Sequence, residues 1–74
     1  MYILEFKGNI IKLTLTHLLH KTLCENDIVR LRIDYNGVEK EYSAIVIEKH
    51  AKYIYVELIG EVTQVDNVVF IQQL

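Results

Sequence analysis

Asn36-Gly37 is the feature of this sequence that most constrains its fold, because the dipeptide separates two stretches of alternating apolar and polar residues. Asparagine and glycine both accept the positive φ angles of a two-residue type I′ turn, which links antiparallel strands. The alternation predicts a hairpin with Leu31 opposite Tyr42 on the inward face and Arg32 opposite Glu41 on the outward face. A slip of one residue would turn polar side chains into the core, so the turn and the pattern predict the same register.

The second strand of this hairpin continues into a run, residues 43–47, that is apolar at nearly every position. Such a run indicates burial on both sides, or a long strand that bends as in small barrels. A flat sheet covered by a helix or by a second copy is the alternative. The loop of residues 49–52 has no glycine, proline or asparagine, and leaves open whether Ile47 or Val46 pairs with Ile54.

The N-terminal residues predict another hairpin, over 2–15, with Gly8-Asn9 as its turn. Glycine at the first central position suits a type II′ turn. This register places Leu4 opposite Leu13 on an apolar face, with charged side chains on the other face.

Leucine spacing of three and four residues predicts a short helix over 16–23, with Thr16 as its N-cap. The alternative is that the preceding strand extends through Leu19. Near the end of the chain, Asp66-Asn67 predicts a turn before the stretch 68–71. Both alternating sets of positions in that stretch are apolar, so we expect it to be central in a sheet or at an interface.

These elements predict a mostly β fold with a minor α part. We expect a small barrel-like or rolled antiparallel sheet of about five or six strands, with one short helix after the first hairpin. The order resembles small SH3-like and Sm-like barrels in architecture alone, which implies nothing about function. We expect one domain over 1–74, made up of hairpin 2–15, short helix 16–23, central meander 28–59 and closing strand or strands 61–74.

Composition narrows the classes of protein. The chain has 74 residues, 51% of them hydrophobic, and a net charge of −2. So small a domain with this apolar fraction is expected to share surface with a partner, as a homodimer or higher oligomer. A single cysteine, no signal peptide and no apolar run of membrane-spanning length predict a cytoplasmic protein without membrane association.

The one cluster of metal-ligand side chains is His17, His20 and Cys24, spaced for one helix face. Zinc binds such groups, but no second ligand pair follows. We interpret the histidines as surface residues and Cys24 as a small packed thiol. The glutamates fall on outward positions or in loops. We therefore assign no catalytic residue, metal or cofactor, and expect the protein not to be an enzyme.

Basic and aromatic residues of the central meander could form a nucleic-acid surface, since single strands bind to cationic grooves with stacking rings. Glutamates at neighbouring positions weaken that interpretation. The residues concerned are Arg30, Arg32, Lys40, Tyr42, Lys49, Lys52, Tyr53 and Tyr55.

The sequence favours a non-enzymatic binding module that acts through protein–protein contacts and self-association, with an inhibitor of a host factor from a phage or mobile element as its expected biological role. Outward arginine and tyrosine are typical of protein interfaces. We assign partner binding to Arg30, Arg32, Tyr53 and Tyr55, and self-association to Val68 and Phe70. The alternatives are a nucleic-acid-binding barrel and an oligomer that binds a small ligand, such as a nucleotide, between subunits.

Overall fold

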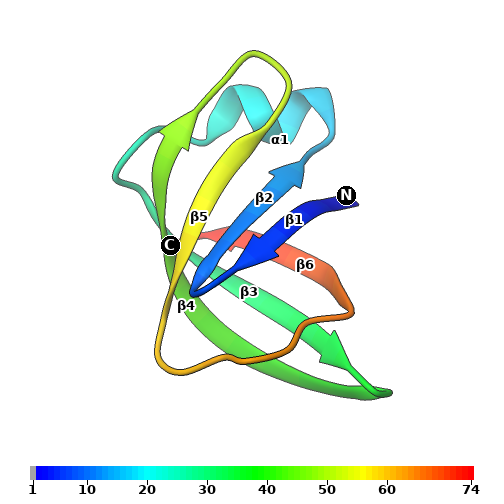
Figure 1. The fold of residues 1–74 in the computed structure, drawn as a ribbon. Helices are drawn as coiled ribbons and strands as arrows, with labels where there is room; N and C mark the ends of the chain where they lie inside the picture. The colour runs from blue at the N-terminus through cyan, green and yellow to red at the C-terminus, as the bar shows by residue number, and fades with distance from the viewer. Residues whose placement is uncertain (1) are drawn as a thin grey trace.

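The computed structural model describes residues 2–74, and in this part of the chain six antiparallel strands form one curved sheet, a half-barrel (Figure 1). The strands are β1 (Tyr2–Lys7), β2 (Ile10–Thr14), β3 (Ile28–Tyr35), β4 (Val38–Lys49), β5 (Ile54–Ile59) and β6 (Asn67–Gln73). Their order across the sheet is β1-β2-β5-β4-β3-β6. A short helix, α1 (His17–Thr22), follows the first hairpin. The predicted fold class is confirmed.

The β3–β4 hairpin has the predicted register at every pair. Asn36 and Gly37 have φ angles of 54° and 80°, both positive, as a type I′ turn requires. Leu31 faces Tyr42, and the pairing continues to the start of β3 without a bulge. The turn dipeptide therefore determines which side chains of both strands point into the core.

The first hairpin departs from its predicted register away from the turn. Gly8 has a φ of 62° and Asn9 has none in the positive region, which is the pattern of the expected type II′ turn. A β-bulge at Leu4 then shifts the pairing, so that Leu13 faces Ile3. The predicted Leu4–Leu13 pair is wrong, and Leu4 is 52% exposed. The cause is one extra residue in an edge strand, where bulges are common.

Strand β4 pairs with β3 and with β5 along a length of 12 residues and curves between them (Figure 1). Neither pairing left open for Ile54 occurs, because Ile54 faces Lys49 and Ile47 forms a β-bulge. The connecting turn is tighter than predicted. His50 N donates to Tyr53 O at 2.9 Å, so the strands pair closer to the turn.

The core fills the concave side of the sheet. It consists of Ile11, Leu13, Leu23, Val29, Leu31, Ile33, Ala44, Val46, Ile54, Val56, Leu58, Val62, Val68 and Ile71. Helix α1 covers one end, where Leu19 packs against the core and Leu23 is fully buried. Thr16 is the N-cap residue, as predicted, but its side chain makes no capping bond, and the packing of Leu19 against the core holds this short helix.

The last strand, β6, lies at an edge of the sheet and pairs with β3. It is therefore not central, which was one of the two expected positions. Val68 and Ile71 point into the core, at 2% and 6% exposure, while Val69 and Phe70 are each 42% exposed. A β-bulge at Val69 lets these two consecutive residues point to the same side of the sheet, away from the core. Residues 61–66 form no strand, so β6 is the one closing strand of the described chain.

Candidate functional site

The convex face of the sheet carries the side chains that alternate with the core. Antiparallel pairing aligns them in rows across the strands. One row joins Ile10 of β2, Glu57 of β5, Ile45 of β4 and Ile28 of β3. Successive rows lie about 7 Å apart, the length of two strand residues. The convex face is thus a regular surface that residues from several strands share.

Isoleucines dominate the middle of the convex face. We define the isoleucine patch as Ile10, Ile28, Ile45, Ile47 and Ile59. Ile28 is 40% exposed and Ile59 is 56% exposed, and the other three are partly buried. None of these isoleucines was predicted from the sequence as a site residue. The signal for the patch was the run 43–47, in which Ala44 and Val46 fill the core while Ile45 and Ile47 point outward.

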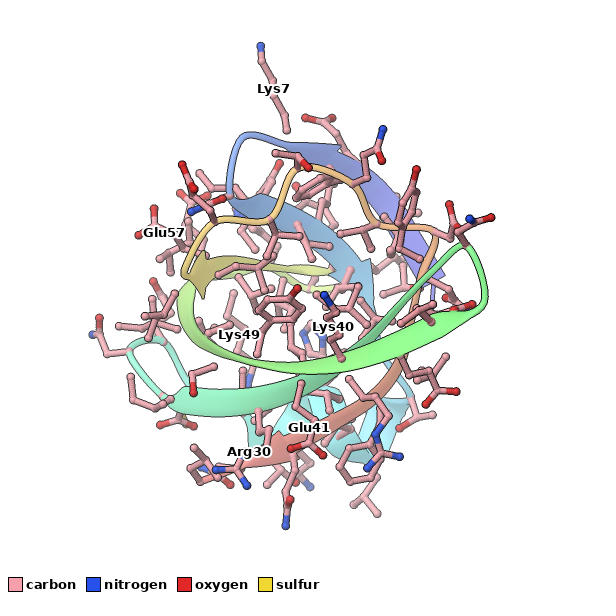
Figure 2. All side chains as sticks on the ribbon, turned by 90° about the horizontal axis from the view of Figure 1, so that it is seen from below. Lys7, Arg30, Lys40, Glu41, Lys49 and Glu57 are labelled. Carbon is pink, nitrogen blue, oxygen red and sulfur yellow. The ribbon has the colours of Figure 1, made fainter. Side chains whose placement is uncertain are left out.

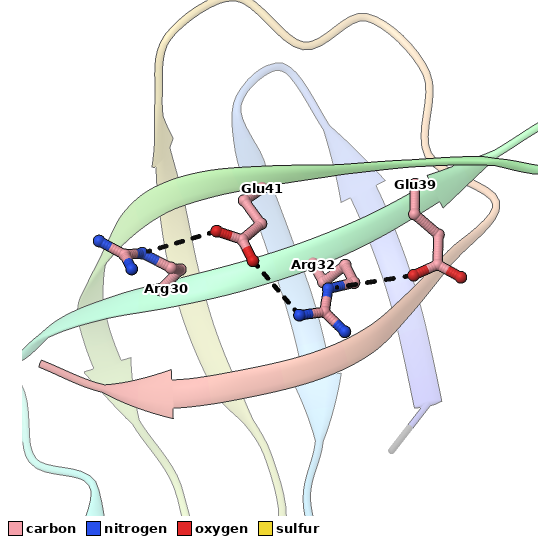
Figure 3. A network of polar contacts seen from close by, with 4 residues as sticks. All are labelled: Arg30, Arg32, Glu39 and Glu41. Carbon is pink, nitrogen blue, oxygen red and sulfur yellow. Dashed lines mark hydrogen bonds and ion pairs between the residues drawn. The ribbon is translucent and has the colours of Figure 1, made fainter.

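Arg30 and Arg32 lie on the convex face, beside the patch. Figure 2 shows Arg30 and Glu41 outside the curve of the sheet. Glu41 pairs with both arginines, at 4.0 Å from Arg30 Nε and 3.3 Å from Arg32 Nη2, and Glu39 lies 4.0 Å from Arg32 Nε (Figure 3). The Arg32 guanidinium lies 5.3 Å from the centre of the Phe70 ring. We call these five residues the arginine cluster.

The ion pairs of the arginine cluster add little to the stability of the fold. Their side chains are 43–54% exposed, and exposed pairs contribute only about 0.2–1 kcal/mol each. What the pairs do is hold long side chains in a defined arrangement. That arrangement presents guanidinium and carboxylate groups of both signs to a partner.

Tyr53 and Tyr55 form a second group with His50 and Lys12, which we call the tyrosine cluster. The His50 ring stacks on Tyr53 at 4.6 Å, and the two tyrosine rings meet edge to face at 5.6 Å. Lys12 Nζ lies 4.3 Å from the centre of the Tyr53 ring. A shallow depression of about 250 Å³ separates Tyr55 from part of the isoleucine patch. The rings are held in place by one another and by a cation.

The predicted partner-binding residues therefore belong to two clusters on one face, with the isoleucine patch between them. Tyr55 and Ile59 share strand β5 and lie about 13 Å apart at normal strand rise. Ile59 pairs with Ser43, which in turn pairs with Arg30. The face thus runs from the tyrosine cluster, over isoleucines, to the arginine cluster.

The two residues predicted for self-association are on opposite sides of β6. Phe70 is exposed on the convex face beside Arg32. Val68 is 2% exposed in the core and cannot contact a partner, so its assignment is corrected. The sequence did not show this, because the bulge that separates their orientations depends on pairing with β3.

The basic and aromatic residues considered for nucleic acid do not share one surface. Lys40 pairs with Ile33, and Tyr42 pairs with Leu31, on the concave side. Figure 2 shows Lys40 and Lys49 within the curve of the sheet, opposite in direction to Arg30. These basic and aromatic residues therefore lie on opposite faces of the sheet.

The histidines and the cysteine do not form a metal site. Within residues 2–74, no group of three His, Cys, Asp or Glu side chains could hold a metal ion. Helix α1 ends at Thr22, so Cys24 does not continue the helix face of His17 and His20. Cys24 is exposed rather than packed.

Comparisons of the chain with protein-family models, with curated proteins and with solved structures found no match. The described residues contain no helix with the length and apolar character needed to span a membrane.

Proposed function

We propose that this protein is a non-enzymatic binding module that docks the convex face of its sheet onto another protein, including a second copy of itself. The observation that carries the proposal is the isoleucine patch, in which Ile28 and Ile59 are exposed and which lies between the tyrosine cluster and the arginine cluster. Such a face has the arrangement of a protein interface, with an apolar centre and a rim that contains arginine and tyrosine.

Burial of the patch would supply the driving force for docking. A fully buried isoleucine side chain contributes about 1.5–3 kcal/mol relative to an exposed one. Ile28 and Ile59 retain much of their surface for this purpose. The flanking clusters would then determine the partner and its orientation, since charged rims give specificity more than affinity.

Self-association is supported by the signs of the rim charges. Arg30 and Arg32 adjoin Glu39 and Glu41, and Lys7 and Glu57 lie on the outside of the sheet (Figure 2). A rim with both signs can pair with its own copy across a two-fold axis. The same interleaved carboxylates disfavour a polyanion such as nucleic acid on this face.

We extend the proposal to the biological role of an inhibitor that occludes a host factor, as a phage or mobile-element protein would. A small module without assigned catalytic groups can block a target by covering its surface. The single exposed Cys24 suits the reducing cytoplasm, where such a target would be met.

The test replaces two exposed isoleucines by lysine, Ile28→Lys and Ile59→Lys together, and measures mass by sedimentation over a range of concentrations. We expect the unaltered protein to associate and the variant to stay monomeric. Val38→Lys is the control, since Val38 is 57% exposed but lies outside the patch. A protein that is monomeric at every concentration, and whose capture of partners the double variant leaves intact, would contradict the proposal.

A further inference from the structure

All three histidines of the chain line one depression, at the end of the half-barrel that α1 covers. The depression has a volume of about 430 Å³ and lies between α1 and the turn from β4 to β5. Its lining consists of His17, His20, Lys21, Lys49, His50 and Ala51.

One contact ties the two walls of this depression together, and two more order the turn from β4 to β5. Lys49 Nζ donates to Leu23 O at 2.7 Å, which ties the end of α1 to β4. His50 N donates to Tyr53 O, and the His50 ring stacks on the Tyr53 ring. His17 and His20 are three residues apart on α1, so they share a helix face. The donors therefore come from two elements that are fastened to each other.

The chemistry of the lining favours an anion. An ammonium group offers three donors, and Lys49 uses one of them within the protein. Each imidazole donates at least one N–H. Among the described residues no carboxylate lines the depression, although Glu48 lies at its margin, 3.6 Å from His50 Nε2. On the convex face, by contrast, glutamates adjoin both arginines.

We propose that this depression binds a tetrahedral oxyanion, the phosphate group of a small molecule. Lysine and protonated histidine form charge-assisted hydrogen bonds with phosphate oxygens. Lys21 and Lys49 in the lining would repel a metal cation. The site lies apart from the isoleucine patch, although it shares His50 with the tyrosine cluster, and it does not depend on the proposed protein-binding function.

The test is an NMR titration of the whole chain with inorganic phosphate, adenosine monophosphate and adenosine, at constant ionic strength set with sodium chloride. We expect both phosphate compounds to shift the signals of His17, His20 and His50. Adenosine should shift none of them. Whichever of inorganic phosphate and adenosine monophosphate binds more tightly shows whether the site takes free phosphate or the phosphate group of a nucleotide. Equal shifts with adenosine, or saturation by chloride alone, would overturn the proposal.

Variants separate a specific site from a general charge effect. We expect Lys21→Gln and His20→Gln each to weaken phosphate binding about tenfold, the effect of losing one charged hydrogen bond. Lys40→Gln makes the same change of charge in a different depression, which Tyr42 and Glu61 also line, and should leave binding unaltered. Equal weakening by Lys40→Gln and Lys21→Gln would show a non-specific charge effect and overturn the site.

A single-stranded oligonucleotide tests a polymer as the natural ligand. We expect a short oligonucleotide to bind no more tightly than adenosine monophosphate, because the depression is local and the adjoining face carries glutamates. Affinity that rises with each added nucleotide would overturn the small-molecule proposal in favour of nucleic acid.

Discussion

The guanidinium of Arg32 lies 5.3 Å from the centre of the Phe70 ring, and the pairing of β3 with β6 places the two residues directly opposite each other. An arginine and an aromatic ring at this distance attract each other, by about 0.5–1 kcal/mol at an exposed site. The contact joins the edge strand to the arginine cluster. It thereby makes Phe70 part of the same surface as the ion pairs.

Charge reversal of Arg30 and Arg32 to glutamate tests the arginine cluster. We expect the midpoint of thermal unfolding to fall by only a few degrees, because exposed ion pairs stabilise a fold weakly. Capture of a protein partner, measured by affinity chromatography, should be lost, since four carboxylates would then lie together. Partner capture that survives the reversal would remove the cluster from the interface.

Replacement of Phe70 and Val68 by alanine tests the two sides of β6. We expect Val68→Ala to lower the free energy of unfolding by about 1–3 kcal/mol, because it leaves a cavity in the core. Self-association should be unchanged in this variant. Phe70→Ala should cost less stability and weaken self-association. Chemical denaturation and sedimentation measure the two effects, and the reverse pattern would contradict the orientation of β6.

Alanine variants of Leu4 and Leu13, compared with each other, test the β-bulge in β1. Leu4 is 52% exposed and Leu13 is fully buried. We expect Leu13→Ala to lower the free energy of unfolding by about 2–5 kcal/mol, and Leu4→Ala by less than about 1 kcal/mol. If urea denaturation showed equal losses of unfolding free energy for the two variants, it would support the register without a bulge, in which both leucines face inward.

Substitution of Gly37 tests the turn that connects β3 to β4. Its φ of 80° is costly for a residue with a β-carbon, so Gly37→Ala should lower the free energy of unfolding by about 1–2 kcal/mol. Asn36→Gly is the control, because glycine also accepts the positive φ at that position. We expect it to change stability by less than about 0.5 kcal/mol. A harmless Gly37→Ala in thermal unfolding would argue against a type I′ turn.

Local chemistry in the sequence was sufficient for the parts of the fold that depend on neighbouring residues. Asn36-Gly37 imposes one turn type, and alternation then decides which of Leu31 and Arg32 points inward. The two hairpins, the short helix and the mostly β class follow from such signals. The outward positions of Arg30, Arg32 and Tyr55 could be predicted for the same reason.

Only the tertiary structure decided the bulges, the strand order and the surface that results from them. The bulges at Leu4, Ile47 and Val69 each add one residue to a strand, and a bulge bends the strand that carries it. Curvature is a property of strands far apart in the chain, so no local pattern encodes it. The bulge in β6 buries Val68 and exposes Phe70. The order of strands brings isoleucines from β2, β3, β4 and β5 onto one face.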